Sequence, residues 1–165
     1  MKTKAVVTAI GATSALAEGA PPTAMLYRAT AAGMRIAPIL DHEGSPATLS
    51  FVPTLDPLST GPERIAELSR TALREACAGL AELGARVKLI LCFDGHLAKA
   101  PEGPPPAQLW TTAISRVAAS VVPDLKDLST SVRGAASVGF ALREALDQVA
   151  SGRLDTVVIG GVHSD

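Results

Sequence analysis

The chain has 165 residues, of which 47% are hydrophobic and 19% are charged, and this composition indicates a folded globular protein. Lys and Arg total 15 while Asp and Glu total 16, and aromatic residues make up 3%, so neither charge nor stacking surface favours nucleic acid or an anionic membrane as a partner. Two cysteines form no disulfide framework, and no run reaches the ~18 apolar residues of a membrane span, so we expect one cytoplasmic domain over residues 1–165.

The first third of the chain predicts one strand, one helix and an irregular region. Residues 4–10 (KAVVTAI) form a short run with β-branched residues, which is typical of a buried strand. Residues 22–32 predict a helix that ends at Gly33. Residues 34–57 contain four prolines and predict irregular surface structure, with an edge strand over residues 48–52.

The middle of the chain has the clearest periodicity. Residues 61–83 predict a helix that Thr60 caps and that ends at Gly84, because apolar residues recur at helical spacing. Residues 87–93 (VKLILCF) predict a second strand. Residues 107–122 predict a further helix, which ends before Pro123.

The last third continues the alternation. Residues 126–132 predict a third strand and residues 155–159 a fourth, with a core helix over residues 134–150 between them. We expect that helix to bury one apolar side, formed by Val138, Leu142, Ala145, Leu146 and Val149. The repeated strand–helix order predicts an α/β fold with a mostly parallel sheet flanked by helices.

Three segments together resemble the amino-terminal half of a β-ketoacyl synthase, a member of the thiolase-like superfamily. The first is VVTAIGATSALA at residues 6–17, similar to the opening strand and turn of those enzymes. The second is the helix over residues 64–83 followed by VKLILCFD. The third, residues 129–164, resembles the nucleophile region, with a G-x-x-D exit at Gly152 to Asp155 and a strand that ends in Gly160 and Gly161.

The resemblance covers nearly the whole chain but only half of a family synthase, and it implies a thiolase-like half-fold. Gly160 and Gly161 would form a structural turn that permits close backbone passage. The family's catalytic His residues, or His and Asn, belong to the carboxy-terminal half, which this chain does not match.

The nucleophile that the resemblance implies is not matched by a cysteine. An ungapped alignment on the G-x-x-D exit and the two glycines places Ala135 at the family's Cys, and a second register places Ser131 there. Because a methyl group cannot hold an acyl chain, covalent catalysis of the family type is not available at Ala135. We expect no catalytic residue, and we interpret the chain as a pseudoenzyme, leaving open that it acts as an enzyme.

Other chemistry-bearing residues favour structural roles. Cys77 and Cys92 lie in predicted core elements, and neither has a His at metal-ligand spacing, so we expect no metal site and no cofactor. His163, Ser164 and Asp165 are consecutive, and successive side chains of an extended tail alternate faces, so they predict a frayed end rather than a catalytic triad.

Two features point to binding. Arg133 and Gly134 start a predicted helix and are candidates for holding an anion, such as the phosphate of a phosphopantetheine arm, although an exposed Arg at a helix start is the simpler interpretation. Family topology would place residues 126–132 at the sheet edge, where dimers of the family pair strands. An exposed edge needs covering, so we expect a homo-oligomer or a ketosynthase-like partner, with an acyl carrier as a further candidate.

Two functions therefore remain open from the sequence. The first is a non-catalytic ketosynthase-like subunit or binding module that associates with itself or a partner. The alternative is one part of an acyltransferase of the β-ketoacyl synthase type, which works with a carboxy-terminal half that this chain lacks.

Overall fold

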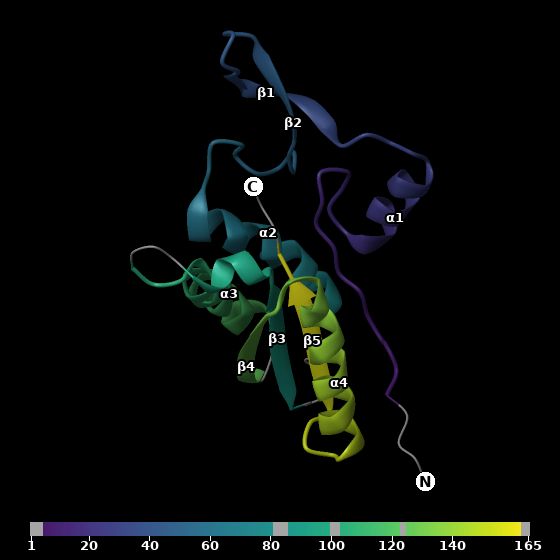
Figure 1. Cartoon of the computed structure of the whole chain (residues 1–165). Helices are drawn as coiled ribbons and strands as arrows, with labels where there is room; N and C mark the ends of the chain where they lie inside the picture. The colour runs from purple at the N-terminus through teal and green to yellow at the C-terminus, as the bar shows by residue number, and fades with distance from the viewer. Residues whose placement is uncertain (1–4, 81–85, 100–102, 123–124, 163–165) are drawn as a thin grey trace.

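A three-stranded parallel sheet forms the centre of the molecule in the computed structural model, which describes residues 5–80, 86–99, 103–122 and 125–162. Strand β3 (Val87–Phe93) lies between β4 (Leu125–Val132) and β5 (Thr156–Gly161), so the strand order is β4-β3-β5. Both pairs are parallel. This arrangement confirms the predicted α/β class, and it leaves β4 and β5 with one outer edge each (Figure 1).

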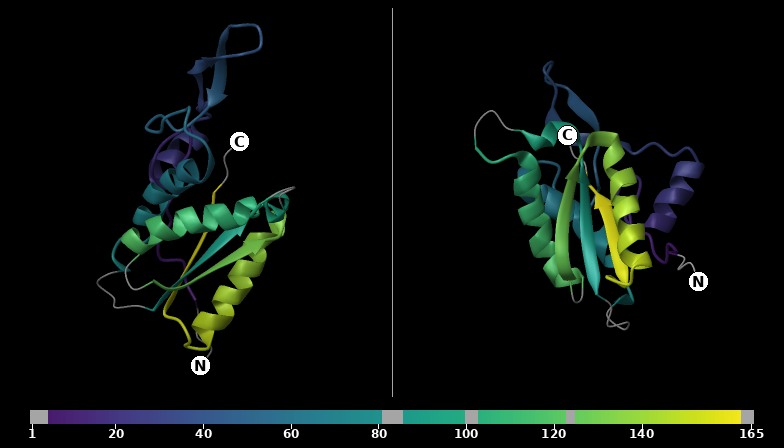
Figure 2. Two further views of the ribbon diagram at one scale, coloured as in Figure 1. Left: turned by 90° about the vertical axis from the view of Figure 1, so that its left-hand side faces the viewer. Right: turned by 60° about the horizontal axis from the view of Figure 1, so that its bottom comes forward.

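Helices α2 (Gly61–Ala76) and α3 (Pro106–Val121) cover one face of the sheet (Figure 2). Every residue of β3 is buried, as expected for the middle strand of a parallel sheet covered on both faces. Leu89 and Leu91 pack with the apolar sides of both helices, among them the fully buried Ile114. Most of the apolar core lies in this layer.

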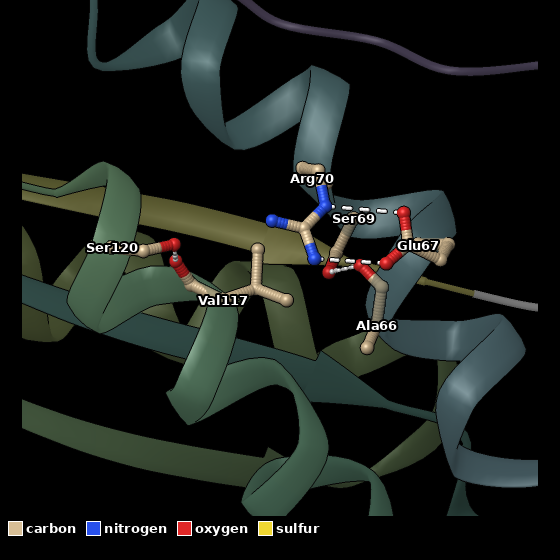
Figure 3. Close-up of polar contacts among 6 residues, drawn as sticks. All are labelled: Ala66, Glu67, Ser69, Arg70, Val117 and Ser120. Atoms are coloured by element: carbon tan, nitrogen blue, oxygen red, sulfur yellow. Dashed lines mark hydrogen bonds and ion pairs between the residues drawn. The ribbon is translucent and has the colours of Figure 1, made fainter.

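The contact between α2 and α3 carries polar groups that are satisfied within their own helices (Figure 3). Ser69 donates its hydroxyl to the carbonyl of Ala66 at 2.8 Å, and Ser120 donates to the carbonyl of Val117 at 2.7 Å. Ser69 is half-buried, and its bond to the preceding turn removes the cost of burying its hydroxyl, while Ser120 is exposed. Also on α2, the partly exposed Arg70 and Glu67 form an ion pair at 2.8 Å (Figure 3).

Helix α4 (Ser137–Ala150) covers the opposite face of the sheet, after a short 3₁₀ turn, η3 (Gly134–Ala136). A small second core forms there from Ile90, Cys92 and Ala141, with partly buried residues of β5 around it. The end of β4 leads through η3 into α4. This is the region where the resemblance to β-ketoacyl synthases would place the nucleophile.

The apolar side predicted for α4 is not buried. Val138, Leu142 and Leu146 are 50%, 48% and 52% exposed, whereas Ser137 and Ala141 are the residues of α4 that are buried. The prediction fails because polar contacts decide the rotation of the helix. Ser137 hydrogen-bonds to the end of β3, and Glu144 binds a lysine within the sheet, so the more polar face turns inward.

The strand predicted over residues 4–10 is also wrong for residues 5–10, and Lys4 lies outside the described residues. Residues 5–10 have no regular secondary structure, and Val6 and Val7 are 76% and 81% exposed. A strand needs a neighbouring strand to satisfy its backbone groups, and residues 5–10 pair with neither open edge of the three-stranded sheet. The chain first packs closely at Gly11, where a Cβ atom would collide with the carbonyl of Ala72 in α2.

The region before α2 is more regular than predicted. Helix α1 (Ala20–Arg28) begins two residues before the predicted start and ends four residues before the predicted end. Strands β1 (Met34–Leu40) and β2 (Pro46–Ser50) form an antiparallel hairpin that projects from the three-layer body (Figure 1). A two-stranded hairpin exposes its outer edges to solvent, so it tolerates prolines, and β1 and β2 each contain one.

The remaining boundaries follow the sequence closely. Helix α3 and strands β3, β4 and β5 begin and end within two residues of the predictions. Helix α2 ends earlier, at Ala76, and the predicted stop at Gly84 lies outside the described residues, as does Pro123. No helix of the described chain is long and apolar enough to cross a membrane.

Candidate functional site

The turn from β4 into α4 holds the positions that the resemblance singled out. Strand β4 ends at Val132, Arg133 follows, and Gly134 adopts a φ of +62°, which disfavours any residue with a Cβ atom. Gly134 lies against the turn after β3, with its Cβ position 3.9 Å from the backbone nitrogen of Gly95. The positive φ at Gly134 therefore lets the chain reverse close to a neighbouring loop and start the helix.

Ser137 anchors this turn, and sequence analysis did not single it out. Its side chain is 1% exposed, and its hydroxyl accepts a bond from the backbone N–H of Arg133 at 2.8 Å. The same hydroxyl donates to the carbonyl of Phe93, the last residue of β3, at 3.1 Å. One bond reaches the turn before α4 and the other reaches the end of β3. The Ser137 side chain therefore fixes the first turn of α4 against the end of β3. A serine at the start of a predicted helix was the available signal.

Neither family register supplies an activated nucleophile at this turn. Ala135 lies in η3, between the glycine turn and α4. Ser131 lies on β4 opposite Cys92 of β3. The Ser131 hydroxyl is buried and has no hydrogen-bond partner among the described residues, so no base is placed to take its proton.

Arg133 is positioned by an aromatic ring. Its guanidinium carbon lies 4.3 Å from the centre of the Phe140 ring, which is a cation–π distance. Because Phe140 is on the first turn of α4, the ring holds the guanidinium above the helix start. Arg133 and Gly134 are the residues predicted to hold an anion. Arg133 contributes a guanidinium group to this position, whereas Gly134 contributes the backbone turn that precedes α4.

A buried cation, Lys88, lies in the middle strand beneath α4. Its ammonium nitrogen is 2.9 Å from a carboxylate oxygen of Glu144 in α4 and 3.0 Å from one of Asp127 in β4. Burial alone would lower the pKa of Lys88, but the hydrogen bonds and charges of Glu144 and Asp127 outweigh that effect and raise the pKa. Sequence reasoning missed this cluster, although a lysine inside an apolar strand was a visible signal.

The two cysteines behave as buried apolar side chains. Burial raises the pKa of the Cys77 thiol and of the Cys92 thiol, which lowers the fraction of reactive thiolate. His42 and His96 both lie in exposed turns beside an acidic residue. Across the described ranges, no three residues of the metal-ligating types gather into a group that could hold an ion.

The G-x-x-D exit has a structural role at the amino-terminal end of the sheet. Asp155 binds the Arg86 guanidinium at 3.0 Å and its backbone N–H at 2.9 Å, and the carbonyl of Gly152 accepts a further bond from Arg86. The Arg86 hydrogen bonds lower the pKa of Asp155 to about 2. These bonds tie the start of β5 to the start of β3.

The two glycines near the end of the chain lie within β5 and not in a turn after it. Gly161 passes close to β3, because its Cβ position is 3.0 Å from the carbonyl oxygen of Cys92, while nothing lies within 4 Å of the corresponding position at Gly160. The close approach at Gly161 lets the last residues of β5 pair with β3. The predictions for His163, Ser164 and Asp165 fall outside the described residues.

Comparison with known proteins adds no relative to this description: no family model, curated protein or solved structure matches the chain.

Proposed function

We propose that the chain is a thiolase-like half-fold that acts as a non-catalytic, ketosynthase-like subunit or binding module, and that it associates through β4 with a second copy or a similar partner. The observation that carries this proposal is the position of β4 at the edge of the parallel sheet, where it pairs with β3 alone. The outer backbone groups of such a strand are a ready template for another strand.

The state of the candidate nucleophiles supports a non-catalytic role. Ala135 has no nucleophilic atom, and the buried Ser131 hydroxyl has no base beside it. The thiols of Cys77 and Cys92 are both buried, and their raised pKa values favour the unreactive protonated form. Covalent acyl transfer therefore lacks a side chain to begin it among these positions.

The exposed side of α4 supports association. Val138, Leu142 and Leu146 recur at four-residue spacing and form an apolar stripe that stays about half exposed. A contiguous apolar surface on a folded domain usually marks a contact with another molecule.

Light scattering after size exclusion tests the association. We expect a mass twice the 16.8 kDa of one chain. Thr130 is an exposed residue of β4, and Thr130→Lys places a charge at the edge, so we expect the mass to fall toward that of one chain. The matched control is Thr112→Lys on the exposed side of α3, which should leave the mass unchanged. A wild-type protein that stays monomeric would overturn the proposal.

A further inference from the structure

An open groove of about 450 Å³ runs along α4 beside β4, and its lining carries an excess of positive charge. Arg133 lines it near the start of α4, Arg143 in the middle of the helix, and Arg153 just beyond its end. From this groove we propose a binding site for a small phosphate-bearing ligand, independent of the association proposed above.

The charge balance of the lining favours an anion. The three arginines share the groove with two carboxylates, those of Glu144 and Asp147. Glu144 is already bound by Lys88 at 2.9 Å and by the side-chain amide of Gln148 at 3.0 Å. Three arginines against two carboxylates leave one net positive charge, and adding the Lys88 and Asp127 pair beneath the groove leaves this balance unchanged. A phosphate monoester, with about −1.5 to −2 charges at pH 7, suits such a lining.

The contacts of these arginines leave donor groups available to a ligand. Arg133 stacks its face on Phe140, which leaves the N–H groups at the edge of the guanidinium plane free to bind oxygen atoms. Arg153 uses its Nε atom on the hydroxyl of Ser151, and its two terminal nitrogens have no partner within the described part of the chain. An arginine fork matches the geometry of two phosphate oxygens.

A buried hydroxyl in the wall of the groove provides an independent observation. Ser131 belongs to the lining, and its oxygen is buried without a hydrogen-bond partner in the described structure. An unsatisfied buried hydroxyl is costly, and a phosphate oxygen can accept its proton. Ser131 and Arg133 thus belong to the β4 end of the groove, where an acceptor-rich ligand would find both a hydroxyl and a guanidinium.

The test is a titration of the full chain with inorganic pyrophosphate or inorganic phosphate. Binding is monitored by the backbone amide chemical shifts in NMR spectra. We expect saturable binding at millimolar concentration or below, with shifts concentrated in residues 130–133 and 140–153. Arg133→Gln and Arg143→Gln should each weaken binding at least about tenfold, the factor that about 1.4 kcal/mol produces. The matched control is Arg116→Gln, an exposed arginine of α3, and it should change the affinity by less than about twofold.

Three results would overturn the inference. They are the absence of saturable binding, shifts that lie mainly outside the groove, and an equal loss in Arg116→Gln, which would indicate a general charge effect. If a groove variant does not fold, the wild-type shift map decides alone. Light scattering on the same samples separates this result from the association through β4, because anion binding does not require a second chain.

Discussion

Single polar residues hold this sheet together at its two ends. Arg86 and Asp155 join the starts of β3 and β5, while Ser137 joins the end of β3 to the turn before α4. Each of these side chains bonds to backbone as well as to another side chain or a second strand. Such bonds position the strands along their length, which apolar packing alone does not specify, since side chains that shift by two residues keep the same face.

The pair at Asp155 makes stability depend on pH in an acid window. The pKa of Asp155 falls from 3.8 to about 2 on folding, so the ionised carboxylate stabilises the folded state. That contribution is complete above pH 3.8 and is lost as the pH falls through about 2. We expect Asp155→Asn to be less stable than wild type at neutral pH and to match it near pH 2, as measured by urea unfolding at each pH.

Arg86→Gln serves as the control for this pair. This variant removes the guanidinium partner of Asp155 and keeps the Asp155 carboxylate. It should therefore lose the same part of the folding stability that wild type loses in acid. A gap between wild type and Asp155→Asn that stays constant from pH 7 to pH 2 would contradict the assignment.

The orientation of α4 shows how polar contacts can override an apolar pattern within one element. The helix has an apolar side that its sequence predicts to be buried, yet Ser137, Ala141 and Glu144 face the sheet. Lys88 explains this choice. Its side chain is 9% exposed, and a buried ammonium group needs carboxylates beside it, which Asp127 and Glu144 supply. Pairwise charge contacts between strands and helices cannot be deduced from periodicity along one element.

Removing the Lys88 charge should loosen the docking of α4. Lys88→Met leaves Asp127 and Glu144 close together without a cation, and we expect a loss of about 1–3 kcal/mol in the free energy of unfolding, below the full cost for a buried pair because both carboxylates reach solvent. The matched control is Arg70→Met, which removes the cation of the exposed Glu67 pair on α2 and should cost less than about 1 kcal/mol. Equal stability of Lys88→Met and wild type in urea unfolding would contradict this role.

At the scale of the whole molecule, the sequence predicts the strands and helices from residue 61 onward better than their assembly. The apolar run of β3 and the periodicity of α3 identify those elements directly. Residues 5–10 have the same strand-like composition but pair with no strand, although the outer edges of β4 and β5 are open, so composition alone does not decide pairing. For the candidate site, the sequence identified Arg133 but not Phe140, Arg143 or Arg153, since only the folded groove brings them together.

The outer edges of the sheet are the feature of the whole molecule that most needs explanation. Strand β4 carries Ser131, which lines the groove, and has an unpaired outer edge beside it. The proposed association covers that edge, and the proposed anion site uses the groove next to it. Both proposals therefore assign the surface around β4 to binding rather than to catalysis.

Amide hydrogen exchange of β4 at several protein concentrations tests the central claim most directly. We expect the backbone amides of residues 125–132 to become more protected as the concentration rises, in step with the mass from light scattering. The amides of the β1–β2 hairpin, which also has exposed edges, should not change. Exchange at β4 that stays the same while the mass doubles, or a mass that never doubles, would contradict association through this strand.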